Sequence, residues 1–262
     1  MKIGCNIRRT FFQLLFLLAL CTTCLESSAQ CQNVVVRHFP KQEDVHILCW
    51  SVTQEGAGYF SQIVVFQTSS RGTTKLLWQS QLENAYSPQI RFIPGIMAQG
   101  MPLALVERQT GAASSLLDVL GKAAGRVVRL LQIDGFQFDV QNLDGGELPV
   151  IVAHRDASIL DVPAIYRWNG SRFVDDSRSH PNFYRQLLVR DKEKLSSDAS
   201  GVVLVNLSRI SVLSGDLSGA RAILADALST EREKGSAANP ETLQLISDEL
   251  RALGHGLSTA PK

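Results

Sequence analysis

The feature that most constrains the fold is a rhythm of short β-forming runs between residue 34 and about residue 176. The runs are rich in Val, Ile, Leu and aromatic residues, and stretches of Gly, Ser and Gln separate them. They form three groups, each roughly forty residues long, which is the pattern of repeated antiparallel sheets. The runs are 34–36, 46–52, 63–67 and 75–78; 89–93, 103–107, 116–120 and 127–133; and 136–140, 149–153, 164–168 and 172–174.

Two turn signals support this division into strands. Residues 121–125 (Gly-Lys-Ala-Ala-Gly) lie between two hydrophobic runs and predict a hairpin loop. Asn169 and Gly170 tolerate positive φ and predict a tight turn between the last two runs.

The third group resembles one blade of the FG-GAP (integrin-type) β-propeller repeat family. The resemblance covers roughly residues 136–176 and rests on the Asp-rich turn 142–147, the hydrophobic run 149–152 and the aromatic run with its Gly turn, 165–170. It implies propeller-like sheets. Closed propellers have about four to eight blades, so three groups imply an incomplete propeller that is open, stacked or self-associating.

After residue 176 the apolar residues follow the helical period of 3.6 instead. Helices are predicted from about 180 to 195, 202 to 214, 216 to 234 and 240 to 253. Residues 204–228 resemble one tetratricopeptide (TPR) unit through Leu204, Leu207, Gly215, Ala220, Leu224 and Ala227. The expected fold is therefore α+β: a propeller-blade-like β-meander at residues 30–176, a helical TPR-like segment at 177–256 and a disordered tail at 257–262.

The first residues have the order of a secretory signal peptide. Lys2, Arg8 and Arg9 precede an apolar core at residues 11–20 and a small-residue cleavage site ending at Ala29. The core is roughly ten residues, whereas a membrane-spanning helix needs about twenty. We therefore expect residues 1–29 to be removed, leaving a secreted or periplasmic chain without a transmembrane helix.

Cysteine usage agrees with export. Cys5, Cys21 and Cys24 lie in the predicted leader, so Cys31 and Cys49 remain. An even number in an oxidising compartment predicts a disulfide between these two; the alternative is two free thiols. Lipid anchoring is less favoured, because Leu, Thr and Gln precede Cys21, Cys24 and Cys31, where a lipoprotein has a small residue.

The charge balance argues against a nucleic-acid partner. The full sequence has 26 basic and 25 acidic residues. Removing residues 1–29 takes away three basic residues and one acidic residue, which leaves a net charge of −1. A chain so nearly neutral has no electrostatic footprint for nucleic acid.

The Asp-rich turn is the sharpest metal candidate, since the resembled family can bind Ca²⁺ there. Asn142 and Asp144 are present, but Gly146 and Val150 stand where the family has acids. A turn held by its own hydrogen bonds is therefore favoured. The five histidines show no HxxH or HExxH spacing, so no metal and no cofactor is predicted; they are His38, His46, His154, His180 and His255.

No catalytic motif is complete. GxSxG is absent, and Gly121-Lys122 lacks the remainder of a phosphate loop. Four loop acids could supply the carboxylate pair of a glycoside hydrolase, although such acids are more often solvated: Asp156, Asp161, Asp175 and Asp176.

The resulting hypothesis is an exported, non-enzymatic binding or assembly module that contacts a protein or glycan of the cell envelope or another copy of itself. Loop tips at 56–58, 111–115 and 156–161 are the expected contact surfaces. A secreted carboxylate-dependent hydrolase and a Ca²⁺-stabilised structural module are the alternatives.

Overall fold

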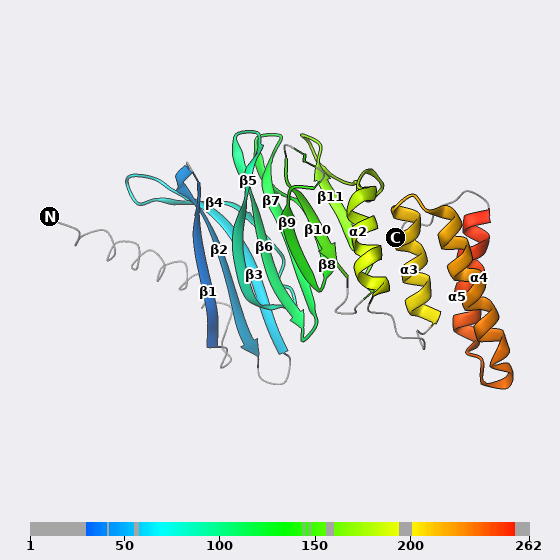
Figure 1. The fold of residues 1–262 in the computed structure, drawn as a ribbon. Coiled ribbons are helices and arrows are strands. Elements are labelled where there is room, and N and C mark those ends of the chain that lie inside the picture. Colours follow the sequence, from blue (N-terminus) through cyan, green and yellow to red (C-terminus); the bar gives the residue numbers. More distant parts are fainter. Residues whose placement is uncertain are drawn as a thin grey trace. The chain divides into compact units, whose positions relative to one another are not determined.

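The structure is a computed structural model that describes residues 30–40, 42–54, 58–143, 145–146, 148–155, 160–193 and 201–254. The chain divides into two compact units, Met1–Ile133 and Asp134–Lys262. Figure 1 shows the elements of both.

The first unit contains two four-stranded sheets, each with its strands in sequence order. Neighbouring strands are antiparallel, as hairpin connections require. The first sheet holds β1 (Gln30–Phe39), β2 (Gln42–Gln54), β3 (Gly58–Thr68) and β4 (Thr74–Gln79). The second holds β5 (Tyr86–Ala98), β6 (Met101–Gly111), β7 (Ser114–Ala123) and β8 (Arg126–Gly135).

Two tight turns close hairpins of the second sheet. Gln99 and Gly100 have φ of 48° and 80°, and Ala124 and Gly125 have φ of 48° and 74°. Positive φ at both central residues is the type I′ geometry that matches strand twist. The hairpin predicted at residues 121–125 is confirmed, although its turn is only Ala124-Gly125.

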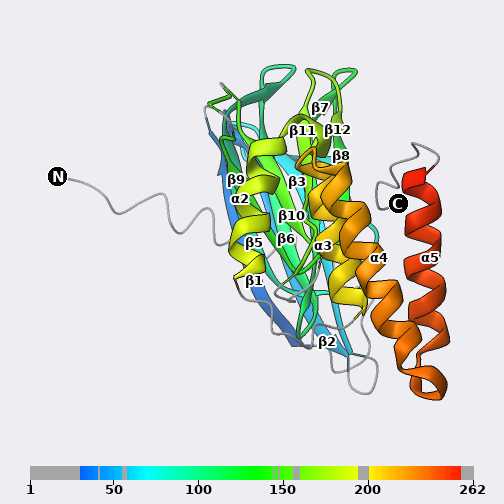
Figure 2. The same cartoon turned by 45° about the vertical axis from the view of Figure 1, so that its right-hand side comes forward.

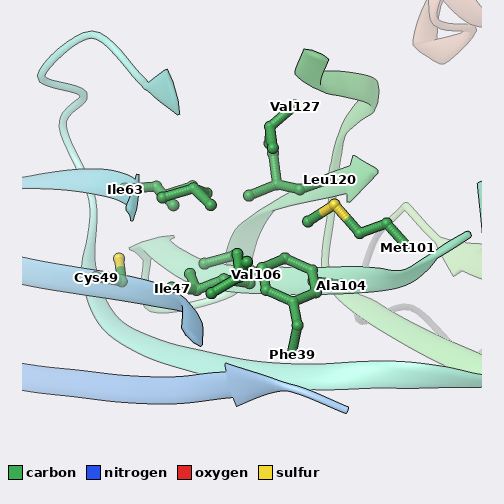
Figure 3. Packing of buried hydrophobic residues seen from close by; sticks show 11 residues of the cluster. Phe39, Ile47, Cys49, Ile63, Met101, Ala104, Val106, Leu120 and Val127 are labelled. Atoms are coloured by element: carbon green, nitrogen blue, oxygen red, sulfur yellow. The ribbon is translucent and has the colours of Figure 1, made fainter. Parts of the chain in front are cut away.

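The core of the first unit lies between its two sheets (Figure 3). Alternate residues along each strand point to the same face, and the facing sides carry an apolar cluster beside a few buried charged residues. The first sheet contributes Phe39, Val45, Ile47, Cys49, Ile63 and Val65, and the second contributes Met101, Ala104, Val106, Leu120 and Val127. Leu77, Trp78, Ile90 and Phe92 pack at the border of this core.

The second unit begins with a third antiparallel sheet. Its strands are β9 (Gln137–Gln141), β10 (Val150–His154), β11 (Ala164–Trp168) and β12 (Phe173–Asp175). The predicted turn at Asn169-Gly170 is present. The Asn169 Oδ1 atom accepts hydrogen bonds from the Ser171 and Arg172 amides at 3.0 Å, and Gly170 has a φ of +97°.

Four α-helices follow: α2 (Pro181–Lys192), α3 (Gly201–Leu213), α4 (Leu217–Glu233) and α5 (Pro240–Gly254), with short 3₁₀ turns η1 (Ser177–Ser179) and η2 (Gly235–Ala237). Pro181 starts α2, where its missing N–H costs nothing. Asp216 caps α4 by accepting the Gly219 amide at 2.8 Å. Figure 2 shows α4 and α5 side by side.

Helix α3 belongs to both cores of the second unit. Its residues Leu207 and Ile210 pack with β10, β11 and α2, whereas Val205 packs with α4 and α5. A helix buried on two sides must be apolar around most of its circumference. The sequence 202–213 has this composition, with Val, Leu or Ile at eight of its twelve positions.

The α+β class, with three four-stranded antiparallel sheets followed by helices, is confirmed. No closed propeller is formed in the described part of the chain. The change from strand to helix falls at Asp176 as expected, but the compact units meet at Ile133 and Asp134 instead. The reason is that β10 and β11 share a core with α2 and α3.

Three sequence-based expectations lie outside the described residues or stay predictions. The leader at 1–29 and the tail at 257–262 are not described, and the TPR likeness of the helices remains a resemblance. Among the helices that are described, none is long and apolar enough to span a bilayer.

Candidate functional site

The first sheet carries a second apolar cluster on the face opposite the core. Leu48, Val64 and Phe66 are buried there, with exposures of 8%, 7% and 7%, and Val36 and Trp50 pack against them half-buried. A sheet with one face in water normally alternates apolar and polar residues. Strands β2 and β3 do not show this alternation of buried and exposed positions, because every residue in 45–49 and in 63–66 is buried. We call the side chains of Val36, Leu48, Trp50, Val64 and Phe66 the outer-face cluster.

An exposed leucine extends this cluster toward the sheet edge. Leu76 of β4 lies directly opposite Phe66, and 53% of its surface is exposed. Residues opposite one another on neighbouring strands share a face of the sheet. The apolar surface therefore continues across three strands to an open leucine side chain.

A histidine pair occupies the same face. His38 of β1 lies directly opposite His46 of β2, and their Nδ1 atoms are 2.7 Å apart. The His46 ring stacks on Phe66 with centroids 4.9 Å apart, which places the pair beside the outer-face cluster. Burial and the neighbouring His38 both lower the pKa of His46, although Asp44 opposes the shift.

A buried ion cluster joins the two sheets on their inner faces. Arg108 of β6 and Asp118 of β7 have fully buried side chains and pair with each other. Arg108 also pairs with Glu83 and donates to Ser61 Oγ of β3 at 3.0 Å. Arg129 of β8 completes the cluster, with its Nε atom 2.6 Å from Asp118 Oδ1 and an Nη atom 3.0 Å from Glu83 Oε1.

The charges in this ion cluster balance, two positive against two negative. Burial opposes charge on Glu83, but Arg108 and Arg129 outweigh it and hold the pKa of Glu83 below its usual value. Burial raises the pKa of Asp118 against the pull of the same arginines. Because no charge is left to recruit a ligand, we interpret the cluster as a structural link between the sheets.

The candidate hydrolase acids are engaged in local structure. Asp161 accepts the Arg155 amide at 3.1 Å and lies 3.0 Å from His154 Nδ1. Asp139, which the sequence did not single out, approaches His154 Nε2 at 3.6 Å. Asp156 lies outside the described residues.

The other two candidate acids stabilise the start of the helical part. Asp176 pairs with Arg167 Nε at 2.7 Å and with His180 at 3.3 Å. Burial opposes charge on Asp176, but Arg167 and Ser179 hold its pKa below the usual value. Asp175 accepts the Ser177 amide at 3.0 Å. In the described part of the chain these acids therefore serve as caps and ion-pair partners.

The remaining surface predictions fall partly on residues that are not described. Asp144 and Glu147 of the Asp-rich turn lie outside the described residues, as do 55–57 and 156–159. Gly111 ends β6 and residues 112–114 are exposed, so this tip is open as expected. Leu160 and Asp161 are buried instead, because the Asp161 carboxylate turns inward to His154.

The disulfide between Cys31 and Cys49 stays a prediction, and the backbone register favours two separate thiols. Cys49 is a free, buried thiol in the inner core, and burial raises its pKa to about 12. The backbone register places Cys49 opposite Val35 and Cys31 opposite Val52. Three residues along a strand span about 10 Å, more than the roughly 7 Å between Cα atoms that a disulfide tolerates. The Cys31 side chain is not described.

Comparisons of the chain with protein-family models, with curated proteins and with solved structures found no match. The case for function therefore rests on the geometry of the chain itself.

Proposed function

We propose that this chain is an exported, non-enzymatic assembly module that binds a second copy of itself through the outer-face cluster. The observation that carries the proposal is the apolar character of a sheet face that does not belong to the inter-sheet core. Leu48, Val64 and Phe66 are already buried, so the apolar surface open to a partner is formed by half-buried Val36 and Trp50 and by exposed Leu76. Exposed apolar surface that adjoins a buried apolar cluster is typical of protein–protein contacts.

A second copy fits this surface because the same sheet already packs against another sheet on its inner face. Two sheets meet face to face about 10 Å apart, with interdigitating apolar side chains. A face related to itself by a two-fold axis is self-complementary, which is the usual geometry of homodimers. Val36, Leu48, Val64 and Leu76 are aliphatic and offer no hydrogen bonds to sugar hydroxyls, which favours a protein partner, whereas Trp50 and Phe66 suit either kind of partner.

The alternative of a secreted hydrolase has less support. Asp161 and Asp176 are each bound by a histidine or arginine and by local N–H or O–H donors. Such carboxylates have few lone pairs left for a substrate. A Ca²⁺-stabilised module would depend on Asp144, whose placement is not described.

The test is the oligomeric state of the chain, expressed with its own leader and purified from the exported fraction. Sedimentation velocity across a hundredfold range of concentration is expected to show a dimer that dissociates on dilution. Leu76→Asp puts a charge beside the outer-face cluster and is expected to weaken the dimer at least tenfold. Leu217→Asp is the matched control, because Leu217 of α4 is equally exposed, at 51%, and lies in the other unit.

A chain that stays monomeric at all concentrations would overturn this proposal. So would a dimer that Leu76→Asp and Leu217→Asp affect equally. The intact mass of the same sample reports whether residues 1–29 have been removed.

A further inference from the structure

The histidine pair brings two imidazole nitrogens within reach of a single metal ion. His38 and His46 are directly opposite on neighbouring strands, and their rings meet edge to face with centroids 4.8 Å apart. At 2.7 Å between the two Nδ1 atoms, two N–H groups cannot face each other. At least one Nδ1 atom therefore presents a lone pair to the space between the rings.

The hydrogen bonds around His46 show that its Nδ1 atom carries the lone pair. The Thr68 hydroxyl donates to the Asp44 carbonyl oxygen at 3.3 Å, so its oxygen accepts from His46 Nε2–H at 2.5 Å. Neutral His46 then carries its proton on Nε2 and its lone pair on Nδ1. Proteins orient metal-binding histidines in this way: the ring N–H that does not bind the metal donates a hydrogen bond to a second residue.

His38 can provide the second ligand from the solvent side. Its side chain is exposed, so water can remove the proton that its Nδ1 atom shares with His46. If His38 is neutral, the proton moves to its own Nε2 atom and none is released. If His38 is protonated, one proton leaves as the metal enters.

We propose that His38 and His46 form a two-histidine site for a divalent transition-metal ion of the Cu²⁺ and Zn²⁺ class. Imidazole nitrogen suits these ions, and their bonds to nitrogen are about 2.0–2.1 Å long. Two such bonds at a near-tetrahedral angle place the Nδ1 atoms about 3.3 Å apart, so the two atoms must separate by about 0.6 Å from their 2.7 Å distance. No group of three or more metal-binding side chains lies together in the described residues, so water completes the coordination.

Metal at this position would tie the edge strand β1 to β2. The β1–β2 pairing shifts register between Gln32 and Val35 and again between His38 and Phe39, so the histidines lie at the end of the regular stretch. Because β1 borders the outer-face cluster, the metal would stiffen that face. The site itself does not depend on self-association.

The test uses Zn²⁺ and Cu²⁺ separately with the purified, chelator-treated chain. Zn²⁺ at about 100 times its Kd is expected to raise the thermal midpoint by about 5 °C or more, and Ca²⁺ is expected to leave it unchanged. Cu²⁺ is expected to give an electron paramagnetic resonance spectrum with nitrogen coupling from two imidazoles.

Variants locate the site. His38→Gln changes an exposed side chain and is expected to abolish the Zn²⁺ shift and to remove one imidazole from the Cu²⁺ spectrum. His154→Gln, in the other unit, is the control and is expected to retain both signals. Thr68→Val removes the acceptor of His46 Nε2–H and is expected to weaken Zn²⁺ binding severalfold.

Two results would overturn the inference. One is the absence of any Zn²⁺ shift and Cu²⁺ coupling in the unaltered chain, which would leave the pair as a shared-proton contact. The other is a signal that persists in His38→Gln or disappears in His154→Gln. Neither result depends on whether the chain dimerises.

Discussion

Replacing Arg108 by Met is the most direct test of how the first unit is held together. The Arg108 side chain is fully buried and donates to Ser61, Glu83 and Asp118. Met fills much of the same volume but carries no charge. The variant therefore leaves Asp118, also fully buried, without its principal partner.

The expected loss of stability follows from what remains around Asp118. Breaking a buried ion pair by removing one partner costs about 3–5 kcal/mol. Asp118 keeps Arg129 Nε at 2.6 Å and Gln132 Nε2 at 3.2 Å, so the loss is expected at the lower end, about 3 kcal/mol. Arg91→Met is the control. The pair of Arg91 with Glu107 is partly exposed, and its loss is expected to cost less than about 1 kcal/mol.

The loss should also depend on pH. Without Arg108, burial raises the pKa of Asp118 in the folded state further above its unfolded value. When the pKa of a carboxyl group is higher in the folded state than in the unfolded state, protonation of that group stabilises the folded state at low pH. This stabilisation is lost as the pH rises through the pKa of the folded state. The destabilisation by Arg108→Met is therefore expected to be smaller at pH 5 than at pH 7.

Urea unfolding followed by tryptophan fluorescence measures the change, and hydrogen exchange in peptides from β6 and β7 assigns it to the first unit. Adding Asp118→Leu to Arg108→Met removes the uncompensated charge and is expected to recover part of the loss. Two results would contradict this account. One is a loss of unfolding free energy in Arg108→Met no larger than that in Arg91→Met. The other is a double variant in which Asp118→Leu adds the same loss that it causes in the unaltered chain.

Two further predictions concern the same unit. In the native chain, Cys49 should not react with a thiol reagent. After unfolding without reductant it should react, both in the unaltered chain and in Cys31→Ser. If the unaltered chain, unfolded without reductant, shows no free thiol, the disulfide is established instead. Gly121→Ala should cost about 1–2 kcal/mol in urea unfolding by overpacking, because a Cβ atom there would lie 2.5 Å from Leu130 Cδ1, 2.6 Å from Leu103 Cδ2 and 3.1 Å from Ala98 Cβ, which has no other rotamer. Gly254→Ala, whose Cβ would meet nothing within 4 Å, should be nearly neutral, and equal costs for the two variants would refute the packing argument.

The strands and helices could be read from the sequence because their signals are local. The β-branched, aliphatic and aromatic content of residues 46–52 and the 3.6-residue period of Ala220, Leu224 and Ala227 are each signals within one element. The type I′ turn at Ala124 shows the limit, since an alanine with positive φ is not a turn signal. The division into units could not be read, because it depends on β10 and β11 sharing a core with α2.

The buried ion cluster had a signal that sequence reasoning missed. Asp118 interrupts the apolar run Leu116–Leu120 and Arg108 follows the run 103–107, so each places a charge on the buried side of a strand. A charge in such a position needs a partner. The sequence therefore indicates that Arg108 and Asp118 have charged partners. Only the structure shows that they pair with each other, with Arg129 and with Glu83.

The sequence by itself determined the kinds of element and their order, because side-chain periodicity and turn chemistry act over a few residues. Tertiary structure decided which side chains meet. Counting cysteines suggested a disulfide, whereas strand register separates Cys31 from Cys49 by three positions. Motif spacing dismissed the histidines, whereas the β1–β2 hairpin places His38 against His46. Both outcomes depend on how strands pair, and pairing is set by the burial of whole faces rather than by the residues along any one strand.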